Sequence, residues 1–421
     1  MAKVGKTKVN ISSSKEVLIA NINLPASKSI SNRALILNAV IQYKFGKSIS
    51  LKNLSQADDT LILQKALKQA SGTIHVDNAG TCLRFLCAYF AAIPGIDLVL
   101  TGSERLLKRP IQPLIKALQS MGAQISYVNA DNSLPIRIKG TALKGGIVQV
   151  EGNESSQFIS ALMLISPLLA EPLTLQVSNK IVSKAYIKLS QTMLQEMGIP
   201  CFISNEYNLV RTDLIKEDNI PATYTIEADW SSAAFFYEAA VLADKADLFF
   251  ENLQLNSIQG DAILANWMEN FGIKSIQKET GVAISKIKVP TPIINSLDFT
   301  NHPDLAPAII CASAGASIPF CAMGIDSLQF KESQRISAIA KGLSLLHYQV
   351  QTTENSLCHD GLAHAFYQNS CLETEDDHRI TMAFAIMAIA QSNMVLTESH
   401  SVKKSFPNFW EEAAKIGIII R

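Results

Sequence analysis

The chain has 421 residues, of which 48% are hydrophobic and 18% charged, a composition typical of a folded protein and not of a disordered one. Its 37 basic and 37 acidic residues give a formal net charge of zero, so net charge supports neither a nucleic-acid partner nor an acidic membrane surface. A chain of 421 residues exceeds one ordinary hydrophobic core, and two domains are expected.

Targeting, thiol and metal signals are weak throughout. The stretch MAKVGKTKVNISSSKEV lacks the apolar segment of a secretory signal, and no uncharged apolar run approaches the roughly 20 residues that span a bilayer. Seven scattered cysteines without a CxxC pair predict free thiols in a reducing compartment. The histidines show no ligand spacing with cysteine or with each other. We therefore expect a cytoplasmic protein with no metal.

Six short polar clusters, each followed by an apolar stretch of helical length, recur along the chain. They are SKSISNR from Ser27, DNAGTCLR from Asp77, ESSQFIS from Glu154, DWSSAAF from Asp229, HPDLAPA from His302 and DDHRITM from Asp376. Their key positions, which differ by 52, 77, 74, 73 and 74 residues, are Lys28, Gly80, Gln157, Ser231, Asp304 and His378. A second series of helices is predicted 26 to 30 residues later, from Asp58, Arg109, Lys184, Gln259, Lys331 and Lys404. This period indicates a repeated supersecondary unit.

Each unit is predicted to run strand, helix, strand, helix and then further strands. In the second unit, for example, TIHV precedes the helix TCLRFLCAYFAA, and DLVLTG precedes the amphipathic helix RPIQPLIKALQSMGA. The first unit is shorter by about 22 residues, so the segment up to Leu24 is expected to pair with the C-terminal group. The resulting prediction is one domain of residues 1–24 plus 229–421 and another of residues 25–228, with three units each.

The first helix start combines cations with hydroxyl groups. Lys28, Ser29, Ser31 and Arg33 surround it, and exposed N–H groups with the helix dipole make such a start suited to phosphate or carboxylate. The alternative is a capped helix with surface charges.

The second and third helix starts are mostly neutral. Gly80, between Asn78 and Thr81, allows backbone N–H groups to approach a ligand, although a plain turn is the alternative. Neither the dinucleotide-binding glycine pattern nor the ATP-binding phosphate loop occurs, which argues against an ATP- or NAD-dependent enzyme.

Hydroxyl and amide donors follow at the third start. Ser155, Ser156 and Gln157 either contact a ligand or cap the helix, and Ser183 and Tyr186 could line the same face.

Charged side chains dominate the last three units. Lys331 and Arg335 are spaced i and i+4, which places them on one helix face if the helix includes both, and Glu332 beside them is a candidate proton carrier. The alternative is a solvated charged face. Asp304 lies at an apolar helix start, where burial could make it a base, although helix capping is the alternative.

Two further cations belong to the final unit. Arg379 precedes the apolar run TMAFAIMAIA, and its partner is either a ligand or Asp376 or Asp377. Lys404 is predicted to open the last helix. Because similar clusters recur at the same phase in both halves, the helix starts are expected to converge on a cleft that holds ligands with several negative charges.

Taken in order, these motifs resemble the EPSP synthase (5-enolpyruvylshikimate-3-phosphate synthase) family. The resemblance extends from Pro25 to Lys404 and consists of LPxSKSxSxR, NAGTxxR, GxxxxxxRP, SSQ, SxxY, PD, KExxR, DHR and KxFP. It implies a two-domain inverse α/β barrel, an enolpyruvyl transferase-like fold with three βαβαββ units per domain. It also implies a monomer without metal or organic cofactor. The implied reaction transfers enolpyruvyl from phosphoenolpyruvate to the 5-hydroxyl of shikimate 3-phosphate through a tetrahedral intermediate.

The resemblance also implies roles for individual residues. It makes Asp304 the general base and Glu332 or Lys28 the proton donor to the methylene carbon. At shikimate 3-phosphate it places Lys28, Ser29, Arg33, Ser155, Ser156, Gln157, Ser183, Tyr186, Asp304, Ser327 and Lys331. At phosphoenolpyruvate it places Lys28, Asn78, Gly80, Thr81, Arg109, Gln157, Arg335, Arg379 and Lys404.

Three positions depart from the family pattern. Gln334 stands where the family usually has Asp, Ser327 where many members have Asn, and Phe85 where some have Pro. Two other functions remain open: the related enolpyruvyl transfer to a UDP-amino sugar, and a noncatalytic binding protein with the same fold. Glyphosate competes with phosphoenolpyruvate in this family, and Gly80 is predicted to leave room for it.

Overall fold

The computed structural model describes residues 8–14, 16–129, 133–287, 295–363, 370–391 and 393–421. The chain divides into two compact units. Unit 1 contains the described residues up to Pro25 together with Glu227–Arg421, and unit 2 contains Ala26–Ile226. The observed break falls one residue after the first predicted crossing and two residues before the second.

Within the described residues, the strands form five four-stranded sheets and one two-stranded pair. All five sheets have one topology, in which a parallel pair is extended by two antiparallel strands. In the sheet β4-β5-β7-β6, for instance, β4 and β5 are parallel, and β7 is antiparallel to both β5 and β6. The parallel pair needs a crossover helix, which gives the βαβαββ unit. The predicted repeated α/β fold is therefore confirmed.

Unit 2 contains two complete repeats and a short one. The short repeat consists of α1 (Lys28–Phe45), β3 (Ser50–Lys52), α2 (Asp58–Ala66) and β12 (Thr223–Thr225). The second consists of β4 (Ser71–His75), α3 (Gly80–Ala91), β5 (Asp97–Thr101), α4 (Glu104–Leu107), α5 (Gln112–Ser120), β6 (Gln124–Tyr127) and β7 (Ile136–Lys139). The third consists of β8 (Gly146–Glu151), α6 (Ser156–Ile165), the 3-10 helix η1 (Ser166–Leu168), β9 (Leu173–Ser178), α7 (Lys184–Glu196), β10 (Cys201–Ile203) and β11 (Leu209–Thr212), followed by η2 (Glu217–Asn219).

Unit 1 contains three repeats. The first consists of β2 (Val17–Ile22), α8 (Trp230–Leu242), β13 (Lys245–Glu251), η3 (Gly260–Ile263), α9 (Leu264–Glu269), β14 (Ile273–Lys278) and β15 (Gly281–Lys286). The second consists of β16 (Ser296–Asp298), η4 (Pro303–Leu305), α10 (Ala306–Gly315), β17 (Phe320–Met323), η5 (Asp326–Phe330), α11 (Arg335–Leu345), β18 (Tyr348–Thr352) and β19 (Ser356–Ala363). The third consists of β20 (Cys371–Leu372), α12 (His378–Ile386), η6 (Met387–Ile389), β21 (Met394–Thr397), η7 (Ser399–Lys404), α13 (Phe409–Lys415), β22 (Ile418–Ile420) and β1 (Lys8–Ser13).

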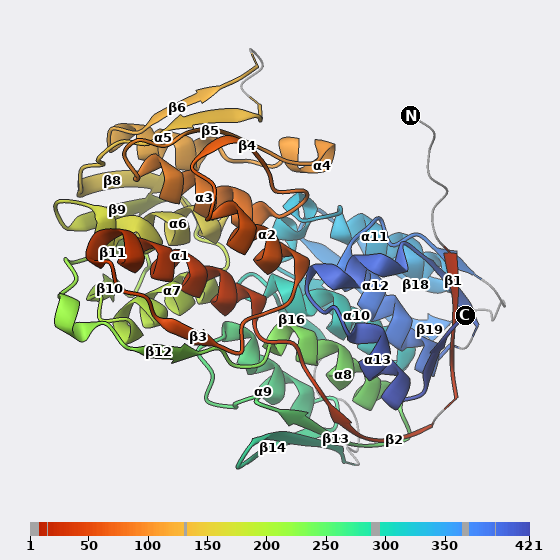
Figure 1. The fold of residues 1–421 in the computed structure, drawn as a ribbon. Helices are drawn as coiled ribbons and strands as arrows, with labels where there is room; N and C mark the ends of the chain where they lie inside the picture. The colour runs from red at the N-terminus through yellow and green to blue at the C-terminus, as the bar shows by residue number, and fades with distance from the viewer. Residues whose placement is uncertain (1–7, 15, 130–132, 288–294, 364–369, 392) are drawn as a thin grey trace. The chain divides into compact units, whose positions relative to one another are not determined.

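The N-terminal strands complete two sheets of unit 1. β1 lies between β21 and β22 and is antiparallel to both, with Ile11 opposite Met394 and Ile420. β2 pairs in parallel with β13 along its whole length. Figure 1 shows the red strand β1 beside the blue C-terminal strands. The short first repeat of unit 2 has only β3 and β12, so no N-terminal strand extends it among the described residues.

The first helix of each repeat forms the core. In unit 2, α1, α3 and α6 pack against each other, and in unit 1 the corresponding helices are α8, α10 and α12. These helices are apolar on nearly every face because they are buried among other helices and sheets. Polar residues recur at their starts, where Ser155, Asp229 and Asp377 accept backbone N–H groups as N-caps. Polar side chains therefore collect at the N-terminal ends of the core helices.

The cysteines differ from the prediction. Cys321 and Cys358 lie opposite each other on β17 and β19 and form a disulfide, so free thiols are wrong for this pair. Cys82, Cys87, Cys201 and Cys311 are buried free thiols, as expected of small core residues, and Cys371 is half-buried. In the part of the chain that the structure describes, no helix is long and apolar enough to cross a membrane.

Candidate functional site

In unit 1, a buried arginine holds the predicted catalytic carboxylates together. The Arg335 side chain is 1% exposed and forms ion pairs with Asp304 (3.0 Å), Glu332 (2.7 Å) and Asp377 (2.8 Å). Burial alone would lower the pKa of this guanidinium, but Asp377, Glu332 and Asp304 outweigh that effect and raise it. Arg335 is therefore a permanent cation that fixes the carboxylates around it.

Asp304 is the meeting point of three cations. Its Oδ1 lies 3.0 Å from Arg335 Nη1 and 3.7 Å from Lys331 Nζ. Its Oδ2 lies 3.2 Å from Arg379 Nη2, while Arg379 Nη1 donates to the Asp304 carbonyl at 3.2 Å. The Asp304 side chain is 13% exposed. Its carboxylate is therefore engaged by charged side chains, and Asp304 is a partner of Arg379 that the sequence did not indicate.

Glu332 connects the cluster to the end of the chain. Its Oε2 accepts from Arg335, and its Oε1 pairs with Lys404 Nζ at 3.0 Å. Burial lowers the pKa of Lys331, and Asp304 opposes that shift. Cations and carboxylates thus alternate, so the predicted anion-binding residues are already neutralised by protein groups.

Two predicted helix positions are wrong, although the residues still belong to this cluster. α11 begins at Arg335, and Lys331 has an extended backbone (φ −84°, ψ −159°), so the two do not share a helix face. Lys404 ends η7 and precedes α13, so it does not open the last helix. Lys331 and Lys404 belong to the cluster because they pair with Asp304 and Glu332, not because of helical spacing.

Asp377 also belongs to the cluster around Arg335, although the sequence indicated it only as a possible partner of Arg379. It accepts from Arg335 Nε, from Ser333 Oγ at 2.9 Å and from the Arg379 backbone N–H at 3.0 Å. The signal available was its position immediately before an apolar helix, which is typical of an N-cap. It positions Arg335 and caps α12 at the same time.

In unit 2, a second buried arginine organises neutral groups. Arg84 is 2% exposed, and its Nη1 donates to Gln157 Oε1 at 2.6 Å, while its Nη2 donates to the Pro110 carbonyl at 3.0 Å. Gln157 Nε2 in turn donates to Thr81 Oγ1 at 3.0 Å. These bonds join the start of α3, the start of α6 and the loop before α5. The motif NAGTxxR contained Arg84, but its role was not predicted.

The Arg109 side chain lies close against Gly80. A Cβ atom built on Gly80 would lie 2.5 Å from Arg109 Nη1 and 2.7 Å from Arg109 Cζ, distances that real Cβ contacts do not show. The guanidinium therefore lies directly over the glycine backbone. Arg109 itself is in the loop between α4 and α5 and does not start a helix as predicted.

The first cluster separates into two environments. Lys28 Nζ pairs with Asp59 Oδ2 at 3.0 Å, and Lys28 and Ser29 are half-buried at the start of α1. Arg33, one turn later, is 2% exposed, and its donors bind Ser190 Oγ, Ser160 Oγ and the carbonyls of Ser29 and Tyr186. Burial lowers the pKa of Arg33 to about 10. Arg33 thus fastens α1 to α6 and α7, and its predicted contact with shikimate 3-phosphate stays a prediction.

Ser183 has a backbone conformation that favours glycine. It precedes α7 with φ 55° and ψ 43°, without a side-chain cap bond, and is 6% exposed. A non-glycine residue in this region is strained by about 1–3 kcal/mol, a feature that clusters at ligand sites. Tyr186 N–H donates to its carbonyl at 3.0 Å, so the two predicted residues lie in one turn.

The remaining neutral residues lie at helix starts. Ser155 caps α6 through Gln157 N–H at 3.3 Å, which supports its capping alternative, and Ser156 is 4% exposed. Asn78 and Thr81 are half-buried on either side of Gly80, as the turn prediction requires.

The departures from the family pattern lie in different surroundings. Ser327, in η5, is 9% exposed, and its hydroxyl has no hydrogen-bond partner among the described residues. Gln334 is exposed at the N-cap of α11 and makes no side-chain cap bond. Phe85 is fully buried, and the Arg33 guanidinium lies 5.4 Å from its ring centre.

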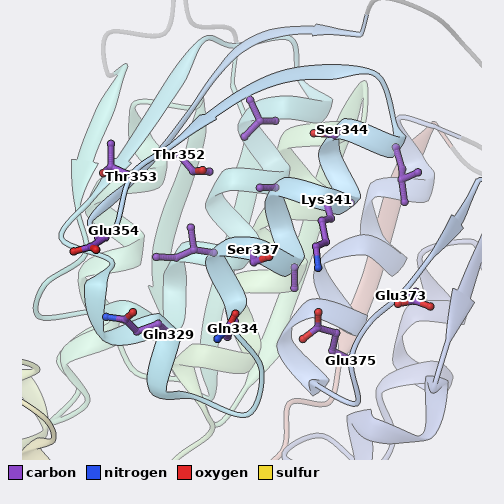
Figure 2. A pocket seen from close by; sticks show the side chains of 16 residues that line it. Gln329, Gln334, Ser337, Lys341, Ser344, Thr352, Thr353, Glu354, Glu373 and Glu375 are labelled. Atoms are coloured by element: carbon purple, nitrogen blue, oxygen red, sulfur yellow. The ribbon is translucent and has the colours of Figure 1, made fainter.

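A pocket of about 840 Å³ lies over the exposed face of α11 in unit 1. Figure 2 shows Glu354 and Glu375 on opposite sides of the helix, with Gln334 between them. None of the predicted site residues lines this pocket, which is therefore separate from the cluster around Arg335. Across the described residues, no group of three or more His, Cys, Asp or Glu side chains is arranged to hold a metal ion.

Comparisons with known proteins identify the family. A family model described as EPSP synthase (3-phosphoshikimate 1-carboxyvinyltransferase) matches residues 66–413. A 3-phosphoshikimate 1-carboxyvinyltransferase of Bacteroides fragilis is 37% identical over 405 residues, covering 96% of each chain. One of Histophilus somni is 30% identical, covering 94% of this chain and 96% of that protein.

Solved structures show the same fold. An EPSP synthase of Acinetobacter baumannii, 21% identical, superposes with a TM-score of 0.76 over 99% of this chain and 100% of its own. An enolpyruvyl transferase of Streptomyces tendae, 14% identical, gives 0.72 over 99% of both chains. From the family match and the extent of these relatives, the chain belongs to the EPSP synthase (3-phosphoshikimate 1-carboxyvinyltransferase) family.

Proposed function

We propose that this chain transfers the enolpyruvyl group of phosphoenolpyruvate to the 5-hydroxyl of shikimate 3-phosphate, releasing phosphate, in the shikimate pathway. The observation that carries the proposal is Asp304, a carboxylate ringed by Lys331, Arg335 and Arg379 at 3.0 to 3.7 Å. A base among cations suits a reaction that removes a proton from a hydroxyl beside bound anions.

The chemistry follows from these groups. Asp304 accepts the proton of the attacking hydroxyl as its oxygen bonds to C2 of phosphoenolpyruvate. A proton is added to the methylene carbon C3, giving a tetrahedral intermediate. Loss of a proton from C3 then re-forms the double bond as the C2–O bond to phosphate breaks. Lys404, Arg379 and Arg335 provide positive charge where phosphate or carboxylate oxygens are held.

The protein carboxylates serve as substitutes for substrate anions. In the structure, Glu332 pairs with Lys404 and Arg335, and Asp304 pairs with Arg379. A phosphate or carboxylate that binds these cations takes over their N–H donors. Glu332 is then released from charge pairing and can exchange a proton with the methylene carbon, with Lys28 as the alternative donor.

The neutral donors of unit 2 complete the substrate specificity in this proposal. Ser155, Ser156 and Gln157 suit the hydroxyl groups and phosphate of shikimate 3-phosphate, and Arg109 suits phosphoenolpyruvate.

The decisive experiment measures phosphate release. Wild type is expected to release phosphate only when phosphoenolpyruvate and shikimate 3-phosphate are both present, and a UDP-amino sugar should not replace the acceptor. Asp304→Ala should lose roughly 10²- to 10⁴-fold in kcat. Asp213→Asn, in an exposed pair with Arg211, is the matched control and should behave as wild type. Binding of phosphoenolpyruvate without phosphate release would instead support the noncatalytic alternative.

We further propose a cytoplasmic monomer, in line with the biosynthetic role of the family. Light scattering of the purified chain at assay concentration checks the oligomeric state. Fractionation of the producing cells checks the compartment.

A further inference from the structure

Asp304 lies in a segment too short to hold its own orientation. It is the middle residue of η4, which has three residues, Pro303–Leu305. The turn is fixed by His302, whose backbone N–H donates to the Phe299 carbonyl at 3.0 Å and whose carbonyl accepts from Leu305 N–H at 3.1 Å. His302 therefore helps to hold the backbone turn from which the Asp304 side chain projects, while the three cations contact the carboxylate itself.

The His302 ring is held by two neighbours from another repeat. It lies edge-on to Trp267, with ring centres 5.4 Å apart and planes at 87°. Its Nδ1 faces Asp261 Oδ1 at 3.6 Å, with the two side chains 18% and 6% exposed. The distance exceeds that of a hydrogen bond, and the contact is an ion pair when the imidazole is protonated.

Asp261 joins this ring to the core helix α8. Its other carboxylate oxygen accepts from Ser231 Oγ at 2.5 Å. A buried carboxylate is costly unless it is paired, and Ser231 and His302 supply one partner for each oxygen. Ser231 belongs to the polar cluster that begins at Asp229, and His302 begins the cluster that contains Asp304, but the proposed reaction uses neither of these two side chains directly. Asp261 therefore links the start of α8 to the segment that carries Asp304.

We propose that Asp261 and His302 are positioning residues for Asp304, which they aim at Lys331, Arg335 and Arg379. This inference rests on the proposed function, because it assigns them a role only through Asp304. Loss of the contact lets the η4 turn rotate and moves the carboxylate relative to the attacking hydroxyl. Substrate affinity, which depends on the other groups, changes little.

The test compares two substitutions at one position. His302→Phe keeps the aromatic packing on Trp267 but cannot pair with Asp261, whereas His302→Asn can donate to Asp261 but loses the ring. His302→Phe should lower kcat roughly 10- to 100-fold, with the KM of both substrates within about threefold of wild type, because a misplacement near 1 Å costs on this order. The kcat of His302→Asn should be at least about tenfold higher than that of His302→Phe. Asp261→Asn should resemble His302→Phe.

Controls separate folding from positioning. Circular dichroism and thermal unfolding of each variant show whether it is folded, and Asp213→Asn again serves as the exposed control. The inference is overturned if His302→Phe retains wild-type kcat, or if its KM values rise while kcat is unchanged. It is also overturned if His302→Asn is no better than His302→Phe. Wild-type kcat in Asp304→Ala overturns the proposed base instead, whatever the His302 variants show.

Discussion

Each unit has a buried arginine near its predicted site residues, and the groups that this arginine contacts differ between the two units. In unit 1, Arg335 contacts three carboxylates, and in unit 2, Arg84 contacts the neutral oxygens of Gln157 and Pro110. Unit 1 therefore contains the groups that can move protons and stabilise charge. Unit 2 contains mainly groups that can recognise hydroxyl and phosphate oxygens. The comparison supports the proposal that unit 1 mainly carries out the reaction and unit 2 mainly recognises the substrates.

Removing each central arginine gives the largest expected effect and tests the comparison directly. Arg335→Met leaves Asp304, Glu332 and Asp377 together without their common cation, which should cost about 3–5 kcal/mol of unfolding free energy. Arg84→Met removes the donors to Gln157 Oε1 and the Pro110 carbonyl, both neutral acceptors, and should cost about 1–3 kcal/mol. Urea unfolding of both variants measures the difference. Equal losses would show that the charge around Arg335 is not what distinguishes the two units.

Gly80→Ala tests the recognition side of the comparison. The added methyl group must displace Arg109, so the KM for phosphoenolpyruvate should rise about tenfold, the equivalent of about 1.4 kcal/mol, with kcat nearly unchanged. Glyphosate should lose more affinity than phosphoenolpyruvate, because it is the longer molecule. Steady-state inhibition at several phosphoenolpyruvate concentrations measures both. Equal losses for the two ligands would contradict the steric selectivity while leaving the displacement of Arg109 intact.

Glu238 sharpens the comparison, because it is a buried carboxyl of unit 1 outside the ion-pair cluster. It is 0% exposed in α8, neither of its oxygens has a hydrogen-bond partner among the described residues, and burial raises its pKa well above the ordinary value. The unfolded chain releases this proton near pH 4, whereas the folded chain keeps it. This contribution to stability is therefore complete below about pH 4 and is lost as pH rises toward the folded pKa, by up to about 1.4 kcal/mol per pH unit.

Glu238→Gln removes that titration. Relative to the variant, wild type should lose unfolding free energy between about pH 4 and pH 8. Denaturant unfolding across this range measures the slope, and Glu411→Gln, at an exposed position in α13, is the control. Parallel pH profiles for wild type and Glu238→Gln would contradict the prediction.

Gln334→Asp is the smallest expected change. A carboxylate at the N-cap of α11 can accept backbone N–H groups that Gln334 does not accept, and it faces the positive end of the helix dipole. Unfolding free energy should increase by about 0.5–1 kcal/mol. Thermal unfolding checks this, and a lower melting temperature would indicate that the added charge disturbs Glu332 instead.

The spacing of the polar clusters was sufficient to predict the repeated fold, because a short-range signal marks each helix start. Ser155, Asp229 and Asp377 cap their helices through bonds to residues two or three positions away. Such local contacts are readable in a sequence.

Contacts between distant segments were not readable in the same way. Nothing near Arg84 indicates that its guanidinium binds the side chain of Gln157, 73 residues later. The disulfide between Cys321 and Cys358 was not predicted for the same reason, because only the pairing of β17 with β19 brings the two cysteines together. For Lys331 and Arg335, helical spacing predicted proximity for the wrong reason, because extended backbone precedes α11.

The placement of β1 between β21 and β22 has a consequence during synthesis. Ile11 pairs with Ile420, which the ribosome adds about 400 residues later. At roughly 5–20 residues per second, β1 waits on the order of 20–80 s for its partners. The segment of unit 2 is continuous and emerges completely during that interval. Unit 2 can therefore fold on the ribosome while the last sheet of unit 1 remains open until the final strand has been made.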